Sequence, residues 1–342
     1  MKYFLLAIAI VITTMCIGPV GFDEGIAVEI ANWRGNTSGA ITLSFDDGYI
    51  ETYNTVMPIL DEKDVKASFN VISAKVGGKY GRLTLADWEH WEDAASKGHE
   101  IASHMATHVH VDEISGEALD DELESSKREI KENVGMEAVS FVYPGGAYDP
   151  RSTAVVERYF LSARTSDDGF NKAVPADLHL LKSKTAVDYA VSSMKRLADM
   201  AEADDAWLIE NLHLVGDSNP TGYSFYLSTK DFESHLDYLI SKDLWIAPQG
   251  DVARYIVERE NSVARLSFPV FRRDSFSITL SNNLDGPVFN VPLTLIVTLP
   301  EGWDAVQVSG WGVILPAKIS KGILYLDVVP NSGAILVERR DV

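Results

Sequence analysis

Residues 40–48 read AITLSFDDG, an apolar run that ends in two adjacent carboxylates and a glycine. A short apolar run followed by turn residues predicts a buried β-strand whose C-terminal end carries Asp46 and Asp47. Asp-Asp-Gly after a strand is also an ordinary turn, so this segment alone does not establish a functional site. A site needs further polar groups from neighbouring strands.

Similar apolar runs recur up to about residue 248, and amphipathic segments with helical periodicity separate them. Strands that alternate with helices predict parallel pairing through crossover connections. We therefore expect an α/β fold, a distorted (β/α) barrel of about seven repeats, with functional residues at the C-terminal ends of the strands. The expected strands are residues 40–45, 67–71, 99–103, 139–143, 160–164, 206–213 and 244–247.

After about residue 261 the pattern changes to short β-branched runs that Asn, Pro and Gly turn residues interrupt. This pattern predicts a small C-terminal antiparallel β-sandwich domain. Trp303 and Trp311 lie in this domain, where core packing or docking against the barrel is favoured over a carbohydrate-binding surface. The expected organisation is a signal peptide at 1–18, an N-terminal extension at 19–37, the barrel at 38–261 and the β-sandwich at 262–342.

The composition is that of a soluble globular protein, with 46% hydrophobic and 23% charged residues. A formal net charge of −20 disfavours nucleic acid and anionic lipid as partners. Residues 4–18 are uncharged and too short for a stable membrane span, which predicts a signal peptide and a secreted or periplasmic protein. A lipid anchor on Cys16, the only cysteine, is disfavoured because the preceding residues match a lipoprotein cleavage site poorly.

His104 and His108 lie four residues apart, about sixty residues after the two aspartates. This spacing can direct both imidazoles at one ion. One carboxylate and two neutral imidazoles leave coordination positions open for water and substrate, as a hydrolytic metal centre requires. Two histidines near a strand end are also common as hydrogen-bonded surface groups, so the combination with the aspartates is what indicates a metal site.

Four segments occur in a fixed order: SFDDG at 44–48, GHEIASH at 98–104 with His108, FVYPGG at 141–146, and LH at 212–213. In this order they resemble the polysaccharide deacetylase family, also called the NodB-homology domain or carbohydrate esterase family 4. The resemblance covers roughly residues 38–260. It also implies a distorted barrel fold.

The resemblance implies that Asp46 is the catalytic base and that one divalent metal ion is bound by Asp47, His104 and His108. Zinc is the first choice because two imidazoles and a carboxylate suit it, although other divalent first-row ions are compatible with these ligands. His110 could compete with His108 for the ion, but His108 stands where the family motif places it.

The third segment is implied to supply a groove wall and a backbone N–H for the oxyanion, at Tyr143, Pro144 and Gly145. The family motif usually carries an arginine shortly before its proline, and FVYPGG has none. Arg164, at the end of another apolar run, is a candidate for orienting the base. A surface salt-bridge partner is an equally good interpretation of Arg164.

The resemblance also implies that His213 is the catalytic acid, and a histidine can deliver a proton near neutral pH. Asp167 and Asp168 could orient this histidine, although a turn is the favoured interpretation. Aromatic residues follow in the next loop, where stacking on sugar rings and packing of the loop are equal alternatives: Tyr223, Phe225 and Tyr226.

We expect a metal-dependent hydrolase that removes N-acetyl groups from a glycan of the N-acetylglucosamine type and releases acetate. One alternative is O-deacetylation of an acetylxylan-type polymer at the same site. A non-catalytic glycan-binding protein on the same fold is the second alternative. The presence of Asp46 and His213 argues against it, because simple binding requires neither a base nor an acid.

Overall fold

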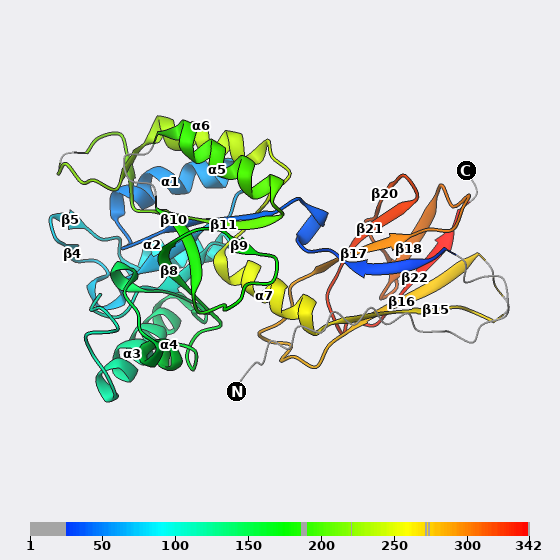
Figure 1. Cartoon of the computed structure of the whole chain (residues 1–342), viewed down its shortest axis with the longest axis horizontal. Helices are drawn as coiled ribbons and strands as arrows, with labels where there is room; N and C mark the ends of the chain where they lie inside the picture. The colour runs from blue at the N-terminus through cyan, green and yellow to red at the C-terminus, as the bar shows by residue number, and fades with distance from the viewer. Residues whose placement is uncertain (1–24, 186–189, 220, 271, 273, 341–342) are drawn as a thin grey trace. The chain divides into compact units, whose positions relative to one another are not determined.

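A computed structural model describes residues 25–185, 190–219, 221–270, 272 and 274–340 (Figure 1). The expected signal peptide and Cys16 lie outside these residues. Contacts divide the chain into two compact units. The larger unit is Ser38–Ala253, and the smaller unit combines the segment before it with the segment from Arg254 onward.

The larger unit is built on a closed ring of seven parallel strands, which confirms the predicted (β/α) barrel. Its last strand pairs with its first, Leu212 opposite Phe45, and this pairing closes the ring. The strands in ring order are β2 (Ala40–Phe45), β3 (Ser68–Val71), β6 (Glu100–Ser103), β7 (Ser140–Val142), β8 (Ser162–Asp168), β10 (Leu181–Thr185) and β11 (Ala206–Leu212).

The ring is distorted where two strands share one edge of β2. The short strand β14 (Trp245–Ile246) pairs with the start of β2, and β3 pairs with its end. β9 (Asn171–Lys172) adds to β11 in antiparallel orientation. Residues 244–247 therefore contain a strand, as expected, but it is not a member of the ring. The seventh ring strand is β10, which the sequence analysis missed.

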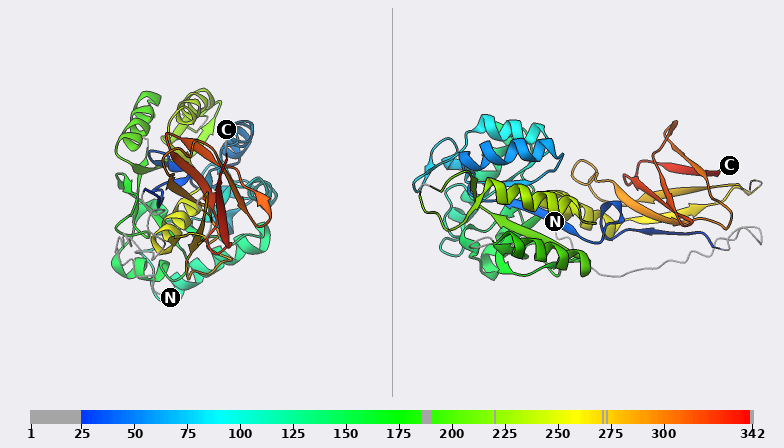
Figure 2. Two further views of the ribbon diagram at one scale, coloured as in Figure 1. Left: turned by 90° about the vertical axis from the view of Figure 1, so that its right-hand side faces the viewer. Right: turned by 90° about the horizontal axis from the view of Figure 1, so that it is seen from above.

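Helices surround the ring (Figures 1 and 2), and most of them bury apolar side chains along one face. In α6, for example, Phe232, Leu236 and Leu239 are buried, and the Ser228 side chain caps the first turn by accepting the Asp231 N–H. No helix in the described ranges is both long and apolar enough to cross a membrane. These helices are α1 (Ile50–Glu62), α2 (Trp88–Ser96), α3 (Glu117–Val134), α4 (Pro150–Val156), α5 (Val191–Ala203) and α6 (Thr229–Ile240).

The N-terminal end of the barrel is filled by the start of α7 (Gln249–Asn261). The Gln249 N–H donates to Ser68 Oγ at 2.9 Å, and the Gly250 N–H donates to Glu100 Oε2 at 3.0 Å. A buried carboxylate is favourable here because the N-terminus of a helix carries partial positive charge. With this end filled, ligands can reach the ring from the C-terminal ends of its strands.

The smaller unit consists of two antiparallel sheets, as expected for the C-terminal domain. Each sheet has one buried face, formed by alternate residues such as Phe276 and Ile278 in one sheet and Leu293 and Leu295 in the other. The first sheet has the order β1 (Ala27–Ile30), β17 (Leu293–Thr298), β21 (Ile323–Val328) and β20 (Lys318–Ser320). The second has the order β15 (Val263–Ser267), β16 (Ser275–Ser281), β22 (Ala334–Arg339), β18 (Val306–Gly310) and β19 (Val313–Ile314).

Two features of this unit go beyond the sequence analysis. Residues 27–30, expected in an N-terminal extension, form β1 and pair with β17. Residues 254–261, expected in the barrel, have their contacts in the smaller unit, where Tyr255 Oη donates to the Ala31 carbonyl at 2.9 Å. Trp303 is packed in the core against Phe276, as expected, with ring centroids 5.8 Å apart. Core packing is wrong for Trp311, which is 52% exposed.

Candidate metal centre

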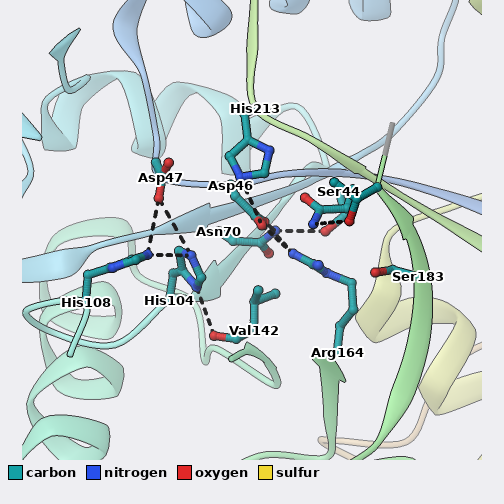
Figure 3. Close-up of polar contacts among 12 residues, drawn as sticks. Ser44, Asp46, Asp47, Asn70, His104, His108, Val142, Arg164, Ser183 and His213 are labelled. Carbon is teal, nitrogen blue, oxygen red and sulfur yellow. Dashed lines mark hydrogen bonds and ion pairs between the residues drawn. The ribbon is translucent and has the colours of Figure 1, made fainter. Parts of the chain in front are cut away.

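The turn after β2 separates the directions of its two aspartates. The Asp46 N–H donates to the Leu212 carbonyl at 2.8 Å and so extends the pairing of β2 with β11. Asp47 then adopts a left-handed conformation, with φ of 72°, and Gly48 continues it with φ of 83°. Asp tolerates this conformation better than most residues. The two carboxylates consequently face different partners (Figure 3).

Asp47 faces two imidazoles, and the three side chains together can hold one metal ion. Its Oδ1 lies 3.7 Å from His104 Nε2 and 3.5 Å from His108 Nε2, and the two nitrogens are 3.2 Å apart. Donor atoms around a tetrahedral zinc ion are separated by about 3.4 Å, given ligand distances of about 2.0–2.2 Å. The donor set and its spacing therefore fit a single divalent ion.

Hydrogen bonds on the far side of each imidazole leave Nε2 free to face that ion. His104 Nδ1 lies 2.9 Å from the Val142 carbonyl, so Nδ1 carries the proton and donates it. His108 Nδ1 lies 3.0 Å from Tyr80 Oη. Such outer contacts fix the ring orientation and the tautomer of metal-binding histidines.

The two imidazoles have the ionisation state that suits a cation, whereas the Asp47 carboxyl must lose a proton to bind one below about pH 7. Burial lowers the pKa of His104 to about 4 and that of His108 to about 3, so both rings are neutral near pH 7. Burial raises the pKa of Asp47 to about 7; the Tyr49 hydrogen bond opposes this rise and the negative charge of Asp46 adds to it. A bound cation would favour the ionised carboxylate.

Asp46 has the opposite environment, because a buried arginine compensates its charge. Arg164 Nη2 lies 2.5 Å and 2.6 Å from the two carboxylate oxygens, and Asn70 Nδ2 donates to Oδ1 at 2.7 Å. Burial alone would raise the pKa of Asp46, but Arg164, His104 and His213 together lower it to about 2. Arg164 is 1% exposed, so it is not a surface residue.

His213 follows the end of β11, and its ring is directed toward Asp46 (Figure 3). Its Nε2 lies 3.9 Å from Asp46 Oδ2. The ring is stacked on Phe225, with centroids 4.9 Å apart and an angle of 26° between the planes. Burial lowers the pKa of His213, while the charge of Asp46 opposes this effect.

The third segment differs in detail from its expected role. The Tyr143 ring is buried in the barrel core against Phe141, and its N–H donates to the Arg164 carbonyl at 3.1 Å. Because the Tyr143 ring is packed in the core, it cannot form a groove wall. Because the Tyr143 N–H is already bonded to the Arg164 carbonyl, it cannot donate to the oxyanion. Pro144 has no N–H, so Gly145 is the position of the three that stays a candidate donor.

His110 lies next to Gly145 and away from the group formed by Asp47, His104 and His108. A Cβ atom on Gly145 would come within 2.7 Å of His110 Nε2, so this imidazole lies against the glycine. It is not a member of the group formed with Asp47. Asp167 and Asp168 lie in exposed contacts, the first accepting the Tyr148 hydroxyl and the second paired with Lys184 at 2.7 Å.

Sequence reasoning missed three residues that contact the site: Tyr49, Asn70 and Tyr80. Tyr49 Oη donates to Asp47 Oδ2 at 2.6 Å, and its ring is 2% exposed. Tyr49 directly follows the Asp-Asp-Gly turn, and this position in the sequence indicates a residue close to the site. Nothing local marks Tyr80, which reaches His108 from the hairpin of β4 (Lys79–Tyr80) and β5 (Leu83–Thr84).

Comparisons with known proteins agree with the motifs. Residues 34–163 match the polysaccharide deacetylase family. Gellan lyase from Bacillus sp is 24% identical over 343 residues, which cover 90% of this chain and 13% of that protein. The putative polysaccharide deacetylase YxkH from Bacillus subtilis (strain 168) is 25% identical over 118 residues, 34% of this chain and 41% of YxkH. The chain thus spans less than half the length of either curated relative.

Among solved structures, a putative polysaccharide deacetylase from Mycobacterium smegmatis has a TM-score of 0.49 and 16% sequence identity. The matched part covers 67% of this chain and 93% of that protein.

Proposed function

We propose that the protein is a metal-dependent hydrolase of the polysaccharide deacetylase type that removes N-acetyl groups from a glycan, because residues 34–163 match that family. The observation that carries the proposal is the different environment of the two adjacent aspartates. Asp47 faces two neutral imidazoles, whereas Asp46 is ionised beside Arg164 and lies close to His213. The first environment suits a metal ligand and the second suits a proton acceptor.

In this proposal Asp47, His104 and His108 hold one divalent ion, with zinc as the first choice. The ion, when bound, polarises the acetyl carbonyl and lowers the pKa of the attacking water. Metal dependence and a glycan substrate are features of the family. The identity of the ion and the N-acetyl preference are our proposals.

The remaining groups move protons and stabilise charge. Asp46, held by Arg164 and Asn70, accepts a proton from water as the water oxygen bonds to the carbonyl carbon. The Gly145 N–H is the proposed donor to the oxyanion that forms. His213 then protonates the amine nitrogen as the carbon–nitrogen bond breaks, which releases acetate and a free amino sugar.

The test is acetate release from chitooligosaccharides and from acetylxylan, with and without a chelator, followed by restoration with Zn²⁺. We expect release from the N-acetylated substrate that the chelator abolishes and Zn²⁺ restores. Release from acetylxylan alone would favour the O-deacetylase alternative. Binding to either polymer without any acetate release would favour a non-catalytic protein.

A further inference from the structure

The two oxygens of Asp47 have different partners. Oδ1 faces His104 and His108, while Oδ2 accepts the Tyr49 hydroxyl at 2.6 Å. Tyr49 is buried, and its ring packs in a small apolar cluster with Leu83, Leu85 and Leu214. The position of the hydroxyl is therefore fixed by packing as well as by the hydrogen bond.

A second tyrosine supports the first. Tyr223 Oη lies 3.4 Å from Tyr49 Oη, and the two rings meet edge to face with centroids 5.8 Å apart. A tyrosine hydroxyl has a single proton, and Tyr49 uses its proton on Asp47. The 3.4 Å contact between the two hydroxyls is long for a hydrogen bond, so Tyr223 supports Tyr49 chiefly through the contact of the rings.

We propose that Tyr49 is a positioning residue that makes Asp47 a one-oxygen ligand of the metal ion. This inference rests on the proposed function, because it assumes that the three-residue group holds an ion. A carboxylate can bind a cation through one oxygen or through both. The Tyr49 hydroxyl occupies Oδ2 and keeps it turned away from the imidazoles, so only Oδ1 is available to the ion.

The number of oxygens matters because it sets how many coordination positions stay open. Two imidazole nitrogens and one carboxylate oxygen leave room for both water and the acetyl oxygen, as a hydrolytic centre requires. A second carboxylate oxygen would occupy one of those positions. Removal of the Tyr49 hydroxyl should thus spare metal binding while it impairs turnover.

The experiment uses Co²⁺ as a spectroscopic probe in the full chain after metal removal. The visible absorption of Co²⁺ is more intense at low coordination number, so it reports the ligands without reference to activity. We expect Tyr49→Phe to bind one Co²⁺ per chain with weaker absorption than the wild type. Its turnover with Zn²⁺ should fall about 10- to 100-fold, the usual effect of losing an outer-shell partner.

A matched control is available in the same unit. Tyr53 Oη donates to Asp93 Oδ2 at the same 2.6 Å, outside the group that holds the ion. Tyr53→Phe should leave the Co²⁺ spectrum, the Co²⁺ affinity and the turnover unchanged. If Tyr49→Phe does not fold, Tyr49→Leu is the second variant, because it also removes the hydroxyl and keeps an apolar side chain beside Leu83, Leu85 and Leu214; the same weaker absorption is expected.

The outcomes separate this inference from the proposed function. A wild-type chain that binds no Co²⁺ would contradict the proposed metal centre. A wild type that binds Co²⁺ and a folded Tyr49→Phe variant with the same spectrum would overturn only the role of Tyr49. Loss of Co²⁺ binding in folded Tyr49→Phe would also overturn it, since the hydroxyl would then be needed for affinity and not for the choice of oxygen.

Discussion

At the scale of single residues, the neighbouring aspartates show that burial alone does not decide the charge of a carboxyl. Both are buried, yet the pKa of Asp46 is about 2 and that of Asp47 is about 7. The two pKa values differ because the Arg164 guanidinium donates hydrogen bonds to Asp46, whereas Asp47 faces neutral imidazoles. Sequence motifs indicated both aspartates as site residues. The charge environment depends on Arg164, which lies more than a hundred residues away along the chain.

The first prediction separates the base from the ligand. Asp46→Asn keeps the shape of the side chain but removes its ability to accept a proton, so turnover should fall about 10²–10⁴-fold. Elemental analysis should still find one metal ion per chain. Asp47→Ala is the comparison, and it should lose both the ion and the activity. Near-normal turnover in Asp46→Asn would show that the base lies elsewhere.

The second prediction concerns the pH dependence of metal affinity. The pKa of Asp47 is about 7 in the metal-free protein, so below this pH each bound ion must displace a proton from its carboxyl. The apparent dissociation constant should rise about tenfold for each pH unit below that value. The histidines add to this dependence only near pH 4 and below, where they begin to gain protons.

Calorimetric titration with Zn²⁺ between about pH 5 and pH 8 measures this dependence. Asp46→Asn is an informative control, because the Asp46 charge contributes to the raised pKa of Asp47. In that variant the pH dependence should begin at a lower pH. An affinity that does not change across the range would contradict the raised pKa.

At the scale of elements, apolar runs predicted the strands of the ring well, except β10. Its sequence is LKSKT, in which lysines alternate with Leu181 and Ser183, so no apolar run marks it. The start of α2 is a smaller discrepancy. Residues 84–87, TLAD, fit the pattern of a capping box that starts at Thr84, but the helix begins at Trp88 and Asp87 caps it by accepting the His90 N–H.

The third prediction tests how closely α7 fits into the N-terminal end of the barrel. A Cβ atom on Gly250 would overlap Glu100 Oε1 and lie 2.7 Å from Val139 Cγ2, both in the larger unit. Gly250→Ala should therefore lower the free energy of unfolding by about 1–3 kcal/mol, the usual cost of overpacking. Chemical denaturation measures the change.

Gly286→Ala is the matched control, because a Cβ atom there would meet no atom within 4 Å. Its stability should stay close to that of the wild type. Equal stability of the two variants would show that the end of the barrel is loosely packed around α7.

At the scale of the whole molecule, the division into barrel and antiparallel sheets could be predicted from the sequence pattern. Alternating strand and helix patterns change after about residue 261 to short β-branched runs separated by turn residues. The placement of residues 27–30 and 254–261 could not, because it depends on contacts with residues far away in the chain. Ala27 pairs with Thr298, and the Val291 N–H donates to Glu258 at 2.8 Å. No local pattern in either segment indicates these partners.

The fourth prediction concerns a chain that ends at residue 261. Such a chain keeps the buried α7 residues Tyr255, Ile256 and Val257 but lacks most of the sheets of the smaller unit. The exposed apolar surface should lower solubility and the melting temperature, while turnover per folded molecule stays close to that of the full chain. A soluble, catalytically intact chain that no longer binds polymer would instead identify the C-terminal sheets as a binding module.

The pairing of β1 with β17 gives the chain an order of assembly. The polypeptide begins the smaller unit at β1, leaves it for the entire barrel, and returns only at α7. During synthesis β1 stays unpaired until its partner strand, residues 293–298, has been made. The barrel is one uninterrupted stretch, so it can fold first. A folded barrel restricts the chain that separates β1 from β17, and a shorter effective loop lowers the entropic cost of pairing the two strands.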